Sequence, residues 1–560
     1  MRCIGNMSSQ AVEYVKTPMD QRDQEFTIDL QPLGRRARVP VGQSVLAAAQ
    51  SVGVELQAVC GGAGTCGQCK VRCVSGNLAR PTSEEFNELC EDDLKAGYRL
   101  ACQVVPLSNI SVDIPAESLT SSQRVQIEGG ELRAPVDPVM PLNDLREERP
   151  ILGLAVDLGT TKIAGYLVDL ETGQTLAGRG VMNPQIIYGE DVISRITFAG
   201  RTDQGGNCLQ RKVIEALNKL IRDLCEEAHS SPEHVFEAVV AGNTAMHHLF
   251  AGLQVQQLGT APYLPASTRP IHQPAKEFGL HLAENAKVYT PPNIAGYVGG
   301  DHLAMLLGVG IEDCLEPTLA IDIGTNTELT LKANGRLLTC SCASGPAFEG
   351  AHIKHGMRAA PGAIERVLFE SGEIHYYTIE RRPATGICGS GILDAIAALL
   401  DAGALDKRGN FRKTAARVRR REGETEFLLV NGDEAENRRE IVLTREDFSE
   451  IQFAKAAIRA GIEVLLRLGQ VDAKSLASFV VAGAFGSYLD LRSAVRIGLF
   501  PEIPLPKFKQ VGNAAGLGAR QMLVSARQRR GGEELAERIE YIELTIHPQF
   551  HGRFVQALSF

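Results

Sequence analysis

The chain has 560 residues, of which 44% are hydrophobic and 22% charged, and its formal net charge at pH 7 is −9. This composition is ordinary for globular proteins, and the length is enough for several domains. The negative charge excludes a dedicated nucleic-acid binder, because such a protein needs a basic surface to hold phosphates. We therefore expect a globular multidomain protein with no nucleic-acid partner.

The hydropathy pattern and the cysteine content bear on the compartment. No run of about 18 apolar residues, long enough to span a membrane, occurs in the chain. The N-terminal tail, 1–24, lacks the apolar core of a secretory signal. Thirteen cysteines, an odd number, favour reduced thiols with one metal site over a disulfide framework. We expect a cytoplasmic protein that does not contact a membrane.

A cysteine-rich loop, CGGAGTCGQC, occupies residues 60–69. Cys60, Cys66 and Cys69 are separated by five and then two residues, and a fourth candidate thiol, Cys102, follows in RLACQ. A [2Fe–2S] cluster is held by four thiolates, three of them typically from one tight loop. The four glycines of the loop let the backbone wrap closely and aim its N–H groups at cluster sulfurs. The pattern predicts a [2Fe–2S] cluster on these four cysteines.

A structural zinc site is the alternative for this loop. Such a site uses two Cys-x-x-Cys pairs or histidines, whereas only one such pair is present here and the first histidine is His229. Cys73 and Cys90 are expected to be half-buried thiols without a ligand role. Cys73 is the first substitute to test if Cys69 is not a ligand.

The segments around the cysteine loop indicate a β-grasp domain. Residues 26–54 show the pattern of strand, turn, strand and helix, and 109–115 that of a closing strand. Together with the loop spacing, this order resembles ferredoxins of the adrenodoxin type. We expect a ferredoxin-like domain at 25–117, followed by a linker at 118–150 that is rich in Pro, Glu and Arg.

The rest of the chain alternates strands and helices, which is typical of α/β domains. Three segments recur in the same order: 151–170 with 318–335, 238–250 with 479–490, and 297–308 with 511–523. Such ordered correspondences indicate an internal duplication. We expect a middle domain at 151–312 as the first half and a C-terminal domain at 313–560 as the second.

Each half offers a strand, an Asp-x-Gly-Thr sequence and a second strand, and such paired halves resemble the actin, Hsp70 and sugar-kinase superfamily. The resemblance implies a duplicated α/β, RNase H-like ATPase with ATP between its halves. It implies that Asp157 and Asp322 hold a hydrated Mg²⁺ and that Asp301 orients the attacking water. Backbone N–H groups and hydroxyls would hold phosphates. The residues implied in this role are Gly159, Thr160, Thr161, Lys162, Gly324, Thr325, Asn326 and Thr327.

Two further glycine-rich turns have a place in the same resemblance. Gly483, Ala484 and Gly486 match the turn that leaves room for adenosine. Gly389, Ser390 and Gly391 precede an apolar helix, whose N-terminus suits phosphate contact. For all these glycines, plain strand-end or helix-start turns are the alternative, and Asp301 could simply begin a helix.

Two segments stay open at this stage. Residues 343–367 crowd charged side chains into a glycine-rich stretch that could line the cleft or meet a partner: Glu349, His352, Lys354, His355 and Arg358. Its histidines have no further ligands nearby in sequence, which favours surface or packing roles over a metal. The basic run 417–422 favours a solvated hairpin over a docking patch.

Taken whole, the chain resembles the reductive activators of corrinoid proteins, through the runs 183–196, 344–365, 450–466 and 547–560. The basic insertion near Arg417 and the N-terminal tail depart from the family, and the C-terminal cluster domain of the methylamine-type activators is missing. The resemblance implies transfer of one electron, with ATP, that returns a Co(II) corrinoid to Co(I). It implies two partners, a corrinoid protein of a methyltransferase system and an electron donor such as a reductase or ferredoxin. The oligomeric state stays open, with a homodimer as one option.

Physical chemistry makes the pairing of cluster and ATPase reasonable. Plant-type [2Fe–2S] centres lie near about −400 mV, and the resemblance implies an acceptor that is harder to reduce. Each 100 mV uphill costs one electron about 2.3 kcal/mol, which a nucleotide-driven change of conformation can supply. The alternatives are an ATP-driven donor to another low-potential metalloenzyme, and a small-molecule kinase or ATPase regulated by the cluster.

Overall fold

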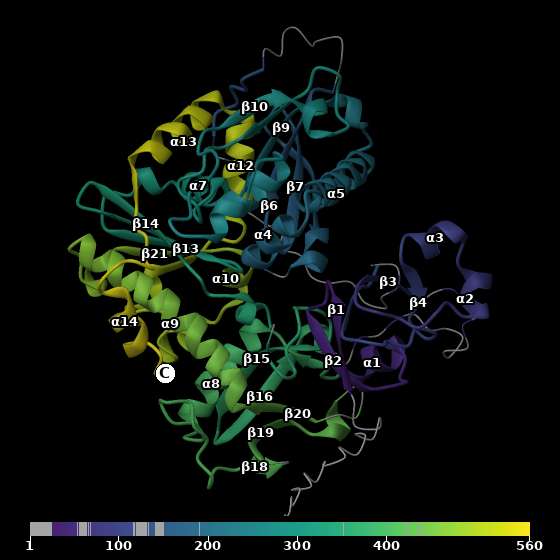
Figure 1. Ribbon diagram of the computed structural model, residues 1–560. Coiled ribbons are helices and arrows are strands. Elements are labelled where there is room, and N and C mark those ends of the chain that lie inside the picture. Colours follow the sequence, from purple (N-terminus) through teal and green to yellow (C-terminus); the bar gives the residue numbers. More distant parts are fainter. Residues whose placement is uncertain are drawn as a thin grey trace, which may run out of the picture.

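The computed structural model describes residues 25–52, 54, 56, 64, 67, 69–115, 118, 132, 134–140, 150–189, 191–350, 352–421, 423–435, 438 and 440–560. The expected N-terminal tail and two predicted cluster ligands, Cys60 and Cys66, lie outside these residues. Figure 1 shows a small N-terminal unit, coloured purple to blue, beside a larger body built on two further sheets.

The N-terminal unit is a five-stranded sheet in the order β2-β1-β5-β3-β4. β1 pairs with β2 in antiparallel and with β5 in parallel orientation, which is the β-grasp arrangement. β2 alternates buried and exposed residues, as a strand with one covered face requires, and the predicted fold of this region is confirmed. The elements are β1 (Glu25–Gln31), β2 (Arg35–Pro40), α1 (Val45–Ser51), β3 (Lys70–Ser75), α2 (Ser83–Glu88), α3 (Glu91–Lys95), β4 (Tyr98–Leu100) and β5 (Ile110–Asp113).

The first half of the larger body is a six-stranded sheet in the order β10-β11-β9-β6-β7-β8. β6 is buried along nearly its whole length, which explains its almost purely apolar sequence. The elements are β6 (Leu152–Leu158), β7 (Lys162–Asp169), β8 (Thr175–Met182), η4 (Pro184–Tyr188), α4 (Val192–Arg201), α5 (Gly205–Glu227), β9 (Val235–Gly242), α6 (Thr244–Phe250), β10 (Ile271–Pro274), β11 (Lys287–Thr290) and α7 (Gly300–Gly308).

The second half repeats this plan in the order β22-β21-β12-β13-β14-β23. In each half the first strand pairs antiparallel with the next one and parallel with a later one, β9 for β6 and β21 for β12. The predicted duplication is thus present in the topology. The elements are β12 (Thr318–Ile323), β13 (Thr327–Ala333), β14 (Arg336–Cys342), η9 (Pro346–Glu349), α8 (Gly389–Asp401), α9 (Arg445–Leu468), β21 (Ser478–Ala482), α10 (Ala484–Tyr488), α11 (Leu491–Arg496), β22 (Phe508–Gln510), α12 (Ala514–Val524), α13 (Ala526–Arg538), β23 (Ile539–Tyr541) and α14 (Phe550–Gln556).

Helices α7 and α12 cross between the two halves. A Cβ added at Gly518 would come within 1.8 Å of the Ala304 carbonyl oxygen, and one at Gly308 within 2.4 Å of that of Ala514. Only glycine lets the helix backbones approach so closely. Although α12 lies late in the chain, its Met522 and Leu523 belong to the core of the first half. The halves are therefore joined through their cores as well as by the chain.

Two small sheets are added to the second half. One contains β15 (Ala363–Glu370), β16 (Glu373–Thr378) and β17 (Gly386–Ile387), and the other β18 (Val418–Arg421), β19 (Glu424–Val430) and β20 (Ile441–Thr444). The basic run lies on the β18–β19 hairpin, where Arg419 pairs with Glu426 at 3.0 Å and with Glu440. This agrees with the expected hairpin.

Part of the expected linker is packed against the larger body. The Asp137 N–H donates to the Val524 carbonyl at 2.9 Å, and the Asp137 carbonyl accepts from the Ala526 N–H at 2.8 Å. Leu132 and Met140 lie against the core of the first half. In the part of the chain that the structure describes, no helix has the length and apolar character needed to cross a membrane.

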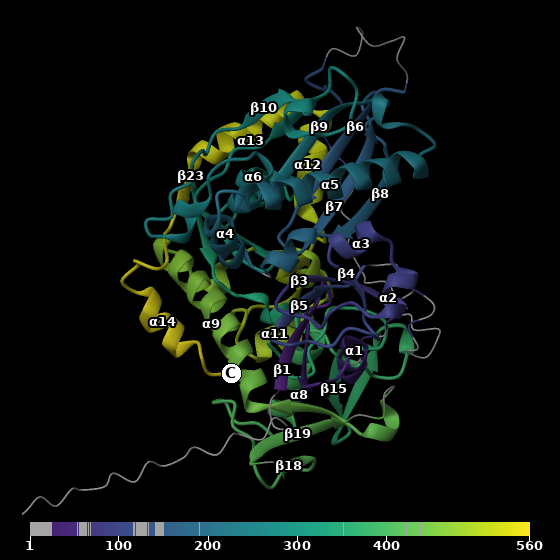
Figure 2. The same cartoon turned by 45° about the vertical axis from the view of Figure 1, so that its right-hand side comes forward.

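The N-terminal unit contacts both halves of the larger body. The β1–β2 hairpin places Arg35 against the second half, where one of its N–H groups donates to Met357 Sδ at 3.0 Å and to the Thr385 carbonyl at 3.2 Å. On the other side β5 packs against η4 of the first half. Figure 2 shows β1 beside β15 from a second direction. The N-terminal unit therefore touches the two parts that would move if the halves closed on each other.

Candidate functional site

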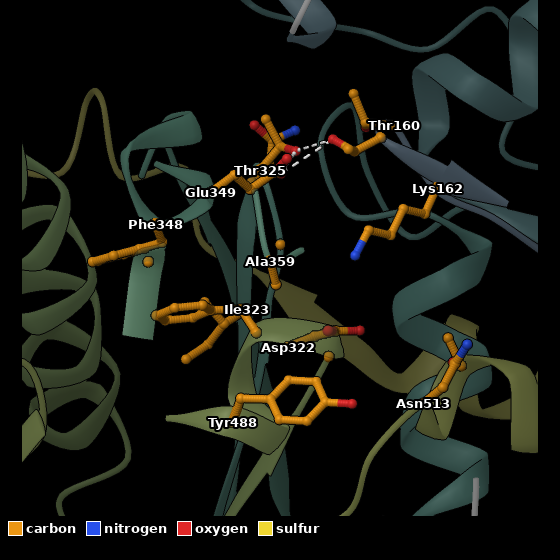
Figure 3. A pocket seen from close by; sticks show the side chains of 18 of the residues that line it. Thr160, Lys162, Asp322, Ile323, Thr325, Phe348, Glu349, Ala359, Tyr488 and Asn513 are labelled. Atoms are coloured by element: carbon orange, nitrogen blue, oxygen red, sulfur yellow. Dashed lines mark hydrogen bonds between the residues drawn. The ribbon is translucent and has the colours of Figure 1, made fainter. Parts of the chain in front are cut away.

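A cavity of about 220 Å³ lies between the turns that follow β6 and β12. The N-terminal ends of α8, α10 and α12 complete its walls. Figure 3 shows Lys162 extending into this space and Asp322 near its centre. The cavity thus collects one turn from each half, as the duplicated sequence predicts.

The turn of the first half is held by buried polar side chains. A Cβ at Gly159 would lie 2.6 Å from the Lys162 carbonyl, so the tight turn requires glycine. Asn183 donates to the Gly159 carbonyl at 2.9 Å, and Arg195 donates to the Thr160 carbonyl at 2.5 Å. Asn243 donates to Thr160 Oγ1 at 2.9 Å. These contacts fix the turn from behind and leave its front facing the cavity.

The turn of the second half is more open. A Cβ at Gly324 would meet only the Asn326 carbonyl, at 3.1 Å. Thr327 is fully buried, and its hydroxyl lies 2.9 Å from that of Ser344. The Ser344 hydroxyl in turn donates to the Thr325 carbonyl at 3.3 Å. Thr327 therefore lies behind the cavity wall, whereas Gly324, Thr325 and Asn326 line it.

Glu349, at the end of η9, joins the two turns. Its Oε1 accepts from Thr161 Oγ1 at 3.1 Å and from Thr325 Oγ1 at 2.6 Å. In Figure 3, dashed lines run from the Thr325 and Glu349 side chains across the upper part of the cavity to the turn that carries Thr160. Its Oε2 lies 3.5 Å from Nε of Arg358, which also lines the cavity. The sequence placed Glu349 and Arg358 in a segment of open role, and the structure assigns both to the cleft.

Three aspartates face the same space. Burial is the main cause that raises the pKa of Asp157 to about 6, of Asp322 to about 7 and of Asp301 to about 8. The charge of Asp157 adds to the effect at Asp322, and both charges add to it at Asp301. Asn513, which the sequence analysis did not single out, donates to Asp157 at 2.9 Å and offsets part of the shift there. Such mutual repulsion suits a group of carboxylates that surrounds a cation.

The donor set fits a hydrated magnesium ion better than a directly bound one. Within the described residues, no three His, Cys, Asp or Glu side chains converge closely enough to hold a metal ion directly. Mg²⁺ typically keeps several waters and uses one or two carboxylates together with phosphates. The aspartates that line the cavity meet this requirement.

Aromatic rings form the opposite side of the cavity. Phe348 stacks on Phe485 with ring centroids 5.2 Å apart, and Tyr488 lies nearby. A Cβ at Gly483 would lie 2.7 Å from Asp322 Oδ1 and 2.6 Å from the Ile323 carbonyl, and its φ is +90°. Gly483 is thus needed for the approach of its turn to β12. The apolar wall suits a nucleobase, although the sequence analysis did not single out its rings.

The remaining predicted nucleotide residues divide between the cavity and its surroundings. Gly389 and Ser390, at the start of α8, line the cavity. A Cβ at Gly391 would meet the Ile364 carbonyl at 2.1 Å, and one at Gly486 would meet Val481 at 2.9 Å, so both support packing behind it. The side chain of Ala484 lies outside what the structure describes.

Two of the four predicted cluster ligands can be placed. Cys69 precedes β3 and Cys102 follows β4, and these paired strands bring the two residues together through a hydrogen bond from the Ala101 N–H to the Cys69 carbonyl at 2.9 Å. Gly64 and Gly67, in the same loop, have positive φ of +79° and +64°. The backbone pairing next to Cys69 and Cys102 and the glycine conformations fit a tight thiolate loop around a [2Fe–2S] cluster.

The two other cysteines of the N-terminal unit have local partners. Cys73 lies on β3, and its thiol donates to the Ser75 carbonyl at 3.6 Å. Cys90 is exposed and caps α3, where its sulfur accepts from the Asp93 N–H at 3.4 Å. Cys73 is half-buried as expected, whereas Cys90 is exposed, so the expectation of a half-buried thiol is wrong for Cys90, which lies at the surface as the cap of a short helix. That neither is a ligand stays a prediction.

Family models match three consecutive parts of the chain. Residues 28–107 match the 2Fe-2S iron-sulfur cluster binding domain, 152–313 the RACo middle region, and 316–560 the C-terminal domain of RACo, the ASKHA domain. The first match supports a [2Fe–2S] cluster in the N-terminal unit. The third supports nucleotide binding in the larger body.

Whole proteins show the same arrangement. A corrinoid activation enzyme, RamQ, from Eubacterium limosum is 35% identical over 430 residues, which are 75% of this chain and 72% of the relative. The [Co(II) methylated amine-specific corrinoid protein] reductase of Methanosarcina barkeri is 28% identical over 441 residues, 73% of this chain and 77% of the relative. A solved structure titled reductive activator for corrinoid, iron-sulfur protein superposes with a TM-score of 0.69 at 33% identity and covers 96% of this chain and 98% of its own. With its cluster domain, middle region and ASKHA domain in this order, the chain belongs to the family of reductive activators of corrinoid proteins.

Proposed function

We propose that this protein transfers one electron to a Co(II) corrinoid protein of a methyltransferase system and so regenerates Co(I), at the expense of ATP. A separate reductase or ferredoxin supplies the electron, in the cytoplasm, where thiols stay reduced. When bound, the [2Fe–2S] cluster provides a one-electron carrier and MgATP the free energy for the uphill step. The likeness to relatives with corrinoid-directed names supports this assignment.

The observation that carries the proposal is the contact between the cluster-bearing unit and the cleft. Arg35 of the β1–β2 hairpin is buried against Met357 and Thr385, next to the cleft residue Arg358. Contact of this kind allows nucleotide state and electron transfer to be coupled through conformation.

Each part of the chain has a role in this proposal. Cys60, Cys66, Cys69 and Cys102 hold the cluster. Asp157 and Asp322 position the waters of a hydrated Mg²⁺, and Asp301 orients the attacking water. The phosphates lie on the two turns and the start of α8, and the base lies between the turn at Gly483 and the Phe348–Phe485 wall.

The experiment uses full-length holoenzyme, a reductant and a cognate Co(II) corrinoid protein, with Co(I) followed by its absorption band. We expect Co(I) only when ATP is present. Cobalt reduction that is equally fast without ATP would refute the coupling. Phosphorylation of a small molecule in place of cobalt reduction would favour the kinase alternative.

A pair of cysteine variants tests the source of the electron. Cys102→Ser should lose the rhombic EPR signal of the dithionite-reduced cluster and lose cobalt reduction, while it still hydrolyses ATP. Cys90→Ser is the matched control, because Cys90 is exposed in the same unit and only caps α3. An unchanged EPR spectrum in Cys102→Ser, or zinc in place of iron in the metal analysis, would contradict the ligand assignment.

A further inference from the structure

Arg358 is a buried cation with unused hydrogen-bonding capacity at the cleft. Its side chain is 7% exposed, and Nε and Nη1 donate no hydrogen bond within the described part of the chain. Its one close acidic partner there, Glu349, is 3.5 Å away, which is longer than a charge-assisted hydrogen bond. Buried guanidinium groups are costly unless they are paired and hydrogen-bonded. Arg358 can therefore form stronger hydrogen bonds with another anion than it forms with Glu349.

Glu349 occupies a position suited to such an anion. One of its oxygens is shared by the hydroxyls of Thr161 and Thr325, 3.1 Å apart, which belong to the turns of opposite halves. A carboxylate oxygen between two hydroxyl donors has the same charge and hydrogen-bonding pattern as a phosphate oxygen in that place. Since Glu349 and a phosphate cannot use these hydroxyls together, nucleotide entry has to displace the glutamate.

The other side of Arg358 faces the N-terminal unit. A Cβ at Gly34, in the β1–β2 turn, would lie 3.4 Å from Arg358 Nη1, so the turn backbone lies next to the guanidinium. The neighbouring pair Arg35 and Met357 is in direct contact at 3.0 Å. Any shift of Arg358 toward the cleft therefore changes the surface on which the β1–β2 hairpin rests.

We propose that Arg358 binds a phosphate of the nucleotide and that Glu349 is the internal anion that takes the phosphate's place when no nucleotide is bound. Phosphate entry releases Glu349 from Thr161 and Thr325 and draws Arg358 away from the hairpin at Gly34 and Arg35. The pair thus reports nucleotide occupancy to the cluster-bearing unit. This inference rests on the proposed ATP site. It adds Arg358 as a phosphate ligand, Glu349 as the group that competes with the phosphate, and a path by which binding is passed to the N-terminal unit.

Two variants give opposite expected results. Glu349→Gln removes the competing charge, so the full-length protein should bind a nonhydrolysable ATP analogue with Mg²⁺ about tenfold more tightly, since each 1.4 kcal/mol is one decade. Arg358→Met removes a charged phosphate ligand and should weaken the analogue about tenfold or more. Adenosine, which has no phosphate, should bind all three proteins equally. A gain of affinity in Glu349→Gln cannot result from misfolding.

Hydrogen exchange of residues 25–40 tests whether nucleotide binding changes the N-terminal unit. The analogue should change exchange there in the wild type and leave it unchanged in Arg358→Met, while Arg358→Lys keeps part of the response. The matched control is Glu380→Gln with Arg382→Met, an exposed pair of the same half with 3.6 Å between its charged atoms. This control should behave as the wild type in both measurements.

The outcomes separate this inference from the proposed function. If the wild type does not bind the analogue, the ATP site itself is wrong. If the wild type binds it and the Glu349 and Arg358 variants bind it equally well, the cleft stands and the displacement model is refuted. If affinities change as expected but exchange of 25–40 does not respond in the wild type, Arg358 is a phosphate ligand without a route to the N-terminal unit, which refutes the coupling part.

Discussion

The two turns of the cleft derive from one duplicated sequence and are supported in different ways. The first is packed tightly at Gly159 and held by Asn183, Arg195 and Asn243, all from its own half. The second is open at Gly324 and is supported by Ser344, which donates to the Thr325 carbonyl. Glu349 accepts from the threonine hydroxyls of both turns and pairs with Arg358 beside the N-terminal unit.

This difference suggests a division of labour between the halves. Buried hydrogen-bond networks that are fully satisfied make a site rigid. A turn with fewer hydrogen-bonding supports behind it can change its partners at lower cost. We infer that the first turn is a fixed platform for phosphate and that the second is the side from which nucleotide binding is passed on.

The largest expected effect tests whether both halves are needed for chemistry. Asp157→Ala and Asp322→Ala should each lower kcat for ATP hydrolysis by about 10²–10³-fold, because each removes a carboxylate that the proposed site uses to hold the hydrated cation. The measurement is phosphate release, with the EPR spectrum of the cluster as a control that the N-terminal unit is intact. Normal ATP hydrolysis in either variant would show that only one half contributes an essential carboxylate.

A glycine pair tests the difference in tightness directly. Gly159→Ala should weaken ATP binding by tenfold or more, roughly the cost of one lost charge-assisted contact, because its Cβ would be 2.6 Å from backbone. Gly324→Ala should have an effect of less than about threefold, since its nearest contact is 3.1 Å and can relax. Calorimetric titration of both variants with the ATP analogue measures this. Equal losses of ATP affinity in the two variants would show that the first turn is no more rigid than the second.

The supports behind the turns should differ in stability as well. Arg195→Met deprives the carbonyls of Gly189 and Thr160 and the Gln185 amide of their donor, and should cost about 3 kcal/mol or more of unfolding free energy. Ser344→Ala removes hydrogen bonds to Thr325 and Thr327 and should cost about 1 kcal/mol. Urea unfolding monitored by circular dichroism compares them. A larger loss in Ser344→Ala would reverse the assignment of rigidity.

The last expected effect is the acid sensitivity of the first half. His247 lies on α6, in the first half, at the sequence position that corresponds to Tyr488 in the second half. Burial lowers the pKa of His247 to about 3. An unfolded histidine has a pKa near about 6.5, so below that pH the unfolded chain takes up a proton that the folded chain refuses. Stability is therefore lost as the pH falls from about 6.5 toward 3, by up to about 1.4 kcal/mol per pH unit.

His247→Gln should remove this contribution. The fall in unfolding free energy between pH 7 and 5 should be smaller in the variant than in the wild type by about 1–2 kcal/mol. Comparison of the two proteins at each pH cancels the titration of groups that do not contact His247, so a second variant, His248→Gln, separates the contribution of the neighbouring His248, 3.2 Å away. The same dependence in wild type and His247→Gln would mean that folding does not lower the pKa of His247.

Local spacing was sufficient to predict the fold and several parts of the site. The alternation of strands and helices and the repeated Asp-x-Gly-Thr segments predicted the duplicated sheets, because strand pairing and turn geometry are encoded within a few residues. The cysteine spacing predicted the ferredoxin-like domain for the same reason. Family resemblance then supplied the order of the domains and the direction of the chemistry.

Turn glycines were harder to assign, because a glycine can serve a ligand or its own packing. Gly391 and Gly486 lie behind the cavity, where a Cβ would strike neighbouring strands. Thr327 also lies behind the cavity, because its hydroxyl is hydrogen-bonded to that of Ser344. Their sequence context is the same as that of residues that do line the cleft.

The sequence by itself indicated the duplicated strand–turn–strand segments and which carboxylates and thiols are available for chemistry, but not that α12 packs into the core of the first half. Only the tertiary structure decided what completes the cleft. Asn513 reaches Asp157 from 356 positions away, and Glu349 reaches Thr161 from 188 positions away. Such contacts depend on the packing of the two halves and of the N-terminal unit against them, and no spacing along the chain encodes them. The proposed path from the phosphate to the cluster-bearing unit likewise depends on contacts that only the tertiary structure decides.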